Sequence, residues 1–97
     1  MSYVFHPAAE AEHLESVGYF EFKQPGLGAS YLAEFEKILA WVCQSPHRYP
    51  IERDPDVRRV QMNRFPYTVL YHEVSGIVQI LAIAHHRRRP QYWLERL

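Results

Sequence analysis

The sequence predicts an α+β fold in which a two-helix hairpin packs on a small, mostly antiparallel sheet. Two stretches with the helical spacing of apolar residues come first, and three β-like stretches follow, two that alternate and one that is apolar almost throughout. A short β-favouring run precedes the first helix, and a short helical turn ends the chain. Helices and strands that are segregated along a chain form separate layers of an α+β domain. The 97 residues are expected to form one domain, 1–97.

The first helix is expected over residues 8–22, after a short strand at residues 3–5. Pro7 suits its first turn, because proline fixes φ and lacks the N–H that a first turn leaves unpaired. Several glutamates lie in its early turns, where the helix dipole favours acids. Its apolar positions are three and four residues apart and predict a core-facing stripe. This stripe comprises Ala11, Leu14, Val17 and Gly18.

The second helix is expected over residues 29–43, after a break at residues 24–26 that contains Pro25 and Gly26. Its predicted apolar stripe comprises Leu32, Phe35, Ile38, Leu39 and Val42. Residues 45–56 carry three prolines and are expected to form a long loop. A loop of that length in a compact domain is either functional or plastic.

Three strands are expected over residues 57–63, 67–73 and 77–84. Ser75-Gly76 is a two-residue turn signal between the last two strands and predicts a tight hairpin. The last strand is apolar at nearly every position, which is typical of a strand buried on both faces. The helix pair should cover one face of the sheet and leave the other face more open.

The charge is distributed unevenly along the chain, although the net charge is zero. Residues 1–47 carry two lysines against six acids, and residues 48–97 carry nine arginines against five acids. This asymmetry indicates a basic face for an anionic partner. The alternative is that the two halves of one fold neutralise each other.

Composition excludes several classes of protein. The hydrophobic share of 47% is that of a globular domain, not of a disordered chain. The longest apolar run, residues 80–84, is far too short to span a bilayer, and no signal peptide is recognisable. The single cysteine, Cys43, cannot form an internal disulfide. We therefore expect a cytoplasmic protein with no membrane association.

Histidine and cysteine spacing gives no reason to expect a metal. His85 and His86 are adjacent, and on a strand adjacent side chains point to opposite faces. His6 and His13 have no further ligand at metal-binding spacing. We expect no metal and no other cofactor.

The strongest surface signal is the run of two histidines and three arginines at residues 85–89. Arginine binds carboxylates and phosphates bidentately, and the adjacent Tyr92 and Trp93 could anchor a partner or fold back on the core. Arg58, Arg59 and Arg64 would extend this basic surface if the first meander strand lies near the open face. The alternative for each arginine is a solvated charge without a partner.

The same residues could perform metal-independent RNA cleavage, which needs a general base, a general acid and a clamp for the phosphate charge. The candidate catalytic residues for that chemistry are Arg59, Arg64, His85, His86, Arg87 and Tyr92. Their spacing alone does not establish the activity, and no phosphate-binding loop or nucleophile elbow is present.

Several short motifs, in their order, resemble the RelE/ParE toxin superfamily of bacterial type II toxin–antitoxin systems. They are residues 6–12 (HPAAEAE), 25–28 (PGLG), 45–46 (SP), 49–50 (YP), 64–71 (RFPYTVLY) and the ending from Ile83 through Trp93. The resemblance spans essentially the whole chain, and the fold of that superfamily agrees with the expected element order.

The resemblance implies one of two activities. RelE-like members cut messenger RNA in the ribosomal A site, whereas ParE-like members bind and poison DNA gyrase. The nuclease branch has an arginine after the tyrosine that opens the middle strand, but here Thr68 follows Tyr67. Tyr92 matches a tyrosine of that branch, yet the form of residues 65–67 and the Tyr-Trp ending resemble the ParE-like branch more. The neutral net charge also weakens the ribosomal alternative.

The favoured interpretation is a gyrase-binding toxin without catalytic residues, neutralised by the acidic tail of a cognate antitoxin. The residues expected to bind partners are Arg58, Arg59, Arg64, Arg87, Arg88, Arg89, Tyr92 and Trp93. A ribosome-dependent messenger endoribonuclease is the first alternative. An inactive orphan member is the second, and a homodimer is left open.

Overall fold

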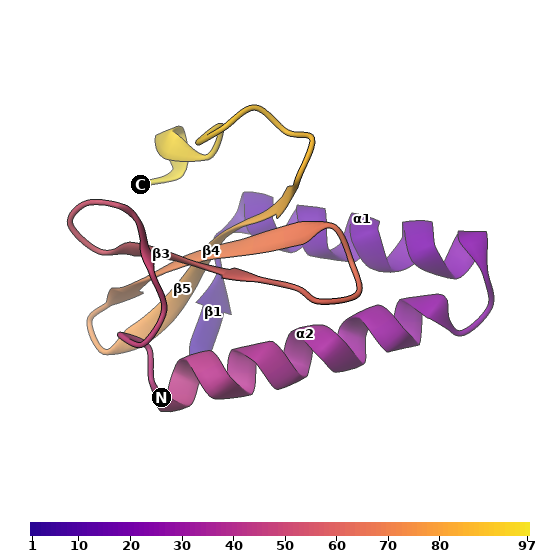
Figure 1. Cartoon of the computed structure of the whole chain (residues 1–97), viewed down its shortest axis with the longest axis horizontal. Coiled ribbons are helices and arrows are strands. Elements are labelled where there is room, and N and C mark those ends of the chain that lie inside the picture. Colours follow the sequence, from indigo (N-terminus) through magenta and orange to yellow (C-terminus); the bar gives the residue numbers. More distant parts are fainter.

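A computed structural model describes residues 1–97 and shows two helices packed on a five-stranded sheet (Figure 1). The elements are β1 (Tyr3–Phe5), α1 (Pro7–Lys23), α2 (Leu27–Gln44), β2 (Ile51–Arg53), β3 (Val57–Gln61), β4 (Tyr67–Val74), β5 (Ile77–His85) and a 3-10 turn at Leu94–Arg96. The strand order is β1-β5-β4-β3-β2, with β1 parallel to β5 and all other pairs antiparallel. The α+β prediction is confirmed.

The helix pair covers one face of the sheet and encloses the larger core. On α2, the predicted stripe is confirmed at Phe35, Ile38, Leu39 and Val42, which are all buried, while Leu32 is only partly buried. From the sheet, alternate residues of β4 enter the same core, including Val69 and Tyr71. This alternation follows from the pleat of a strand, which sends successive side chains to opposite faces.

The stripe predicted for α1 is wrong at three of its four positions, because only Val17 packs against the core. The helix buries Ala9, His13 and Ser16, while Leu14 is 63% exposed. His13 decides this orientation, because its ring packs 4.3 Å from the Phe35 ring, measured between centroids. Tertiary packing of an aromatic imidazole thus prevails over the apolar spacing.

The start of α1 is fixed by His6 and Pro7. The His6 ring Nδ1 accepts a hydrogen bond from the Ala8 N–H at 3.0 Å, and Pro7 occupies the first turn. The ring nitrogen therefore satisfies one of the backbone donors that a helix N-terminus leaves unpaired. This capping role was not expected from the sequence.

The second face of the sheet is less open than predicted, because the C-terminal segment folds back over it. Trp93 is 2% exposed and belongs to a smaller core with Val57, Leu70, Leu81 and Ala82. A bulge in β5 explains why two successive residues face this core. Leu70 pairs with Ala82 and Tyr71 pairs with Ile80, so Leu81 is the extra residue.

The predicted long loop at residues 45–56 contains a short strand. Within it, β2 pairs with β3 at the edge of the sheet, and Arg58 donates to the carbonyl oxygens of His47 (3.1 Å) and Tyr49 (2.7 Å). Three residues are too few to show a periodicity, so the sequence could not reveal this strand. The predicted hairpin is confirmed, with positive φ at both Ser75 and Gly76. Neither helix is both long and apolar enough to cross a bilayer.

Candidate partner-binding site

A basic cleft lies between the second face of the sheet and the C-terminal segment. Its volume is about 250 Å³. The sheet contributes Arg59, Gln61 and Thr68, and the segment after β5 contributes Arg88 and Arg89. The only acid among the lining residues is Glu52, so positive charge prevails. Guanidinium groups converging on one concave site favour carboxylate or phosphate groups as ligands.

The three arginines of the cleft differ in how they are held. Arg59 donates to the Ile51 carbonyl oxygen at 3.1 Å and to the Glu52 carboxylate at 3.3 Å, so its charge is partly compensated. Arg88 stacks on the Tyr92 ring, with its guanidinium carbon 3.9 Å from the ring centroid. Arg89 is exposed, and neither it nor Arg88 forms an ion pair. These two side chains are therefore free to meet an anionic partner.

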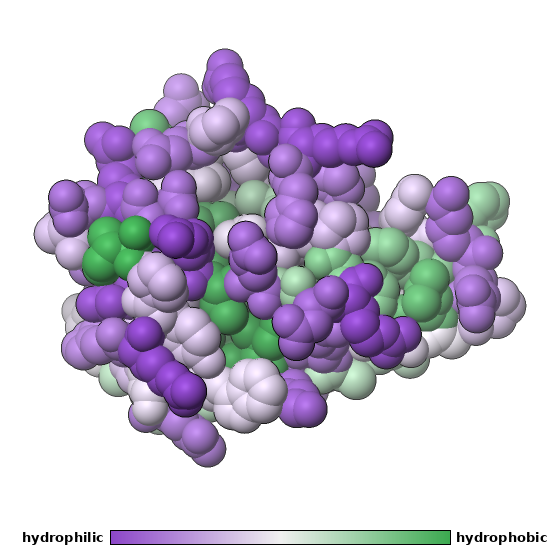
Figure 2. Space-filling model, in the orientation of Figure 1, coloured by the Kyte–Doolittle hydropathy of each residue, from purple (hydrophilic) through white to green (hydrophobic).

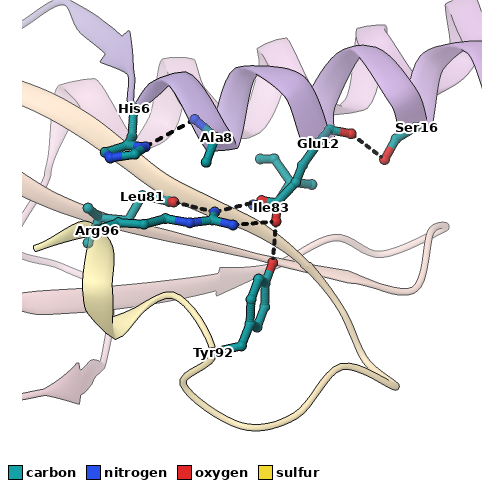
Figure 3. Close-up of polar contacts among 8 residues, drawn as sticks. All are labelled: His6, Ala8, Glu12, Ser16, Leu81, Ile83, Tyr92 and Arg96. Carbon is teal, nitrogen blue, oxygen red and sulfur yellow. Dashed lines mark hydrogen bonds and ion pairs between the residues drawn. The ribbon is translucent and has the colours of Figure 1, made fainter.

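The C-terminal segment is fastened to α1 by the carboxylate of Glu12 (Figure 3). Arg96 donates to both carboxylate oxygens, at 3.0 and 2.9 Å, and also to the Leu81 carbonyl oxygen at 2.9 Å. The Tyr92 hydroxyl donates to Glu12 at 2.7 Å, and the Ile83 N–H donates at 2.9 Å. A helix, a strand and the C-terminal segment thus meet at one carboxylate.

This environment shifts the pKa of the Glu12 carboxyl group and the pKa of the Tyr92 hydroxyl group. Burial by itself would raise the pKa of Glu12, but the hydrogen bonds from Arg96, Tyr92 and the Ile83 amide prevail and lower it. Burial, together with its hydrogen bond to Glu12, raises the pKa of Tyr92. Glu12 therefore remains ionised and Tyr92 remains a protonated donor near neutral pH.

Sequence reasoning did not identify Glu12 or Arg96 as parts of the site. In the sequence, Glu12 is one of several acids of the first helix, and Arg96 is one of the nine arginines of residues 48–97. A second link of this kind joins β2 to the segment after β5, where Arg53 donates to Gln91 at 3.0 Å. Such long-range pairs leave no local pattern in a single sequence.

The expected partner-binding residues lie in three places. Arg59, Arg88, Arg89, Tyr92 and Trp93 line the cleft, although Trp93 is part of the core rather than of the exposed surface. Arg87 is exposed beside them but does not line the cleft.

Arg58 and Arg64 lie elsewhere. Arg58 lines a separate hollow with His47 and Tyr71, and its hydrogen bonds hold the loop that precedes β2. Arg64 borders a groove along α2, next to Glu34. The predicted basic surface is therefore limited to the residues in and beside the cleft and does not include Arg58 and Arg64.

The candidate nuclease residues converge only in part. His85, Arg59 and Tyr92 line the cleft, but Arg64 does not. His86 is exposed, and its N–H donates to the Pro66 carbonyl oxygen at 2.9 Å. The His85 ring Nδ1 accepts from the Arg87 N–H at 3.0 Å.

Thr68 does line the cleft, and it stands where the resemblance to the nuclease branch implies an arginine. No group of three or more metal-ligating side chains could hold a metal ion.

A second hollow, of about 400 Å³, lies beside the cleft between α1 and the ends of β4 and β5. His85 and Arg88 line both hollows and so separate them. Tyr19, Phe20 and Tyr67 give the second hollow an aromatic lining. A partner that places an anionic group on Arg88 could therefore place an apolar side chain alongside.

Comparison with known proteins gives a family match and a structural match. The sequence matches the family described as the ParE toxin of the type II toxin–antitoxin system parDE over residues 3–90. The fold is similar to a solved structure described as the chromosomal ParDE toxin–antitoxin system from P. aeruginosa, with a TM-score of 0.74 and 17% identity. That match covers 88% of this chain and 95% of the other. No curated protein matches the sequence significantly.

Proposed function

Because this chain belongs to the ParE toxin family of type II toxin–antitoxin systems, we propose that it binds and poisons DNA gyrase in the cytoplasm. A cognate antitoxin neutralises it. The observation that carries this proposal is the basic cleft, in which Arg88 and Arg89 are exposed on a segment that Glu12 fastens to α1. A preorganised set of guanidinium groups suits the recognition of an anionic protein surface.

Binding fits the geometry better than catalysis does. RNA cleavage needs an acid, a base and a charge clamp around one phosphate. Here Thr68 replaces the clamp residue, Arg64 lies outside the cleft, and the Tyr92 hydroxyl already donates to Glu12. The remaining groups can hold an anion but do not form a complete proton-transfer pair.

The antitoxin contact follows from the same charges. An acidic segment that folds on binding would place carboxylates against Arg88 and Arg89, which form no ion pair within the chain. The contact should weaken as salt is added, because exposed charges are screened.

A ribosome-dependent endoribonuclease is the second candidate. It is favoured by one observation, that His85 lines the cleft together with Arg59 and Arg88. A histidine beside two guanidinium groups could act as a general acid or base next to a phosphate.

One pair of assays tests the proposal. The purified chain is added to DNA gyrase with relaxed plasmid, and separately to ribosomes programmed with messenger RNA. We expect supercoiling to stop and cleaved complexes to accumulate at near-stoichiometric protein, with intact messenger RNA. Messenger cleavage with unimpaired gyrase would replace the proposal by the nuclease. Inertness in both assays would indicate an orphan member.

A further inference from the structure

The outward face of α1 is apolar. Leu14 is 63% exposed and Phe22 is 90% exposed. Ala11 and Gly18 complete a stripe with spacings of three, four and four residues, and both are exposed. The helix buries a different face, with Ala9, His13 and Ser16. We call the four exposed residues Ala11, Leu14, Gly18 and Phe22 the outer stripe.

Neither close packing nor a positive φ requires a glycine at position 18. A Cβ added there would meet no atom within 4 Å, and the residue lies inside a helix, where glycine is unfavourable. Gly28 is different, because a Cβ there would lie 2.9 Å from the Val17 carbonyl oxygen, where the two helices pack closely. A glycine at the centre of an exposed apolar stripe permits the same close approach by a helix from outside the chain.

The charged side chains that border the outer stripe are mostly acidic. Glu10 and Glu15 are exposed on its two sides. Glu21 is also exposed, but its carboxylate accepts from the Gly26 and Gly28 N–H groups. Lys23 is the one base nearby, and its ammonium lies over the Tyr19 ring, 5.4 Å from the centroid. The free charges beside the stripe are therefore negative.

We propose that the outer stripe docks one amphipathic helix of a partner protein, with apolar residues at i, i+3 or i+4, and i+7 and with Lys or Arg alongside. The apolar side chains would pack on Leu14 and Phe22, the backbone would approach at Gly18, and the cations would meet Glu10 and Glu15. A second copy fits less well, because pairing this face with itself would bring acids against acids.

Figure 2 shows apolar surface at the end of the molecule where α1 and α2 meet. The outer stripe points away from the sheet, whereas the basic cleft lies on the opposite face of the sheet. Acids flank the outer stripe and arginines line the cleft. The outer stripe therefore suits a basic partner, and the cleft suits an acidic one. The inference does not rest on gyrase binding.

The test uses two designed helical peptides as probes. Both carry the same leucine stripe, flanked by lysines in one and by glutamates in the other. We expect the lysine peptide to bind with a dissociation constant at least about tenfold lower. Its amide shift changes should map to residues 11–22.

Two substitutions locate the contact. Gly18→Leu should raise the dissociation constant of the lysine peptide at least about tenfold without lowering the melting temperature, because the space around Gly18 is open. Ala29→Leu, at an exposed position of α2, is the matched control and should leave binding unchanged.

Four results would overturn the proposal. They are an absence of lysine-peptide binding, equal binding of both peptides, binding that Gly18→Leu does not change, and self-association of the chain that Phe22→Glu abolishes. The last would assign the stripe to a second copy.

Discussion

The Glu12 carboxylate and the Arg96 guanidinium share two hydrogen bonds although 84 residues separate them in the sequence. Both side chains are mostly shielded from water. The pair decides where the C-terminal segment lies, and with it the position of Arg88 and Arg89 at the cleft.

Replacing Glu12 by glutamine should destabilise the protein. Glu12→Gln retains the shape but removes the charge that Arg96 faces, so we expect a loss of about 1–3 kcal/mol in the free energy of unfolding. Urea denaturation measures the loss, and hydrogen exchange should show faster exchange after residue 90. Glu10→Gln, an exposed carboxylate of the same helix, is the control and should change stability little. Equal losses in the two variants would contradict the role of Glu12.

Stability should fall as the solution becomes mildly acidic, because His13 is buried. Burial lowers the pKa of His13 below its ordinary value, although Glu36 and Glu10 act in the opposite sense. The unfolded chain therefore takes up a proton first, below about pH 6.5. The contribution of neutral His13 to the free energy of unfolding is complete above that pH and is lost as the pH falls further. His13→Gln should flatten this part of a stability–pH curve, and an unchanged slope would count against it.

The stability of the protein should decline a second time at lower pH, because of Glu12. The pKa of Glu12 is lower in the folded chain than in the unfolded one, so its contribution is complete above about pH 4.3 and disappears as the pH falls through the folded value. The Glu12→Gln variant should lack that step in acid denaturation. If the stability of the variant falls with pH as steeply as that of the parent, another carboxylate is responsible for the loss.

Truncation of two aromatic residues should affect stability to very different extents. Trp93→Ala should cost about 3–5 kcal/mol, because the side chain is buried against Leu70 and Leu81. Phe22→Ala should change stability by no more than about 0.5 kcal/mol, because Phe22 is exposed. Thermal and urea denaturation measure both. A tolerated Trp93→Ala would mean that the C-terminal segment does not cover the sheet.

Two glycines offer a similar contrast. Gly76 has φ of 79° in the β4–β5 turn, where an L-residue is strained, so Gly76→Ala should destabilise by about 1–2 kcal/mol. Gly18→Ala should instead stabilise by about 0.5–1 kcal/mol, because alanine is the better helix former and space is free. The two free energies of unfolding should therefore change in opposite directions, and a destabilising Gly18→Ala would show that Gly18 is needed within the fold.

Periodicity predicted the strands more reliably than the first helix. In β4, the alternation separated Val69 and Tyr71 from Leu70, and the structure places the two sets in different cores, because pleating enforces a period of two. In α1, the apolar spacing predicted that the face with Leu14 is buried, whereas the contact of His13 with Phe35 in α2 turns a different face inward.

The candidate site could be predicted only in part. Arg88 and Arg89 were visible as a local run of charge, and the cleft does contain them. Arg58 and Arg59 are neighbours in the sequence, but adjacent residues of a strand face opposite sides, so only Arg59 reaches the cleft. The hydrogen bonds of Glu12 with Tyr92 and Arg96 depend on the folded chain path and could not be predicted.

The most direct test of the proposed function compares two charge reversals in a gyrase supercoiling assay. We expect half-inhibition by the double variant Arg88→Glu/Arg89→Glu to need at least about tenfold more protein than half-inhibition by the parent does. Arg48→Glu, an exposed arginine outside the cleft, should inhibit as the parent does. Inhibition by a correctly folded double variant at the parental concentration would contradict the assignment of the cleft to gyrase.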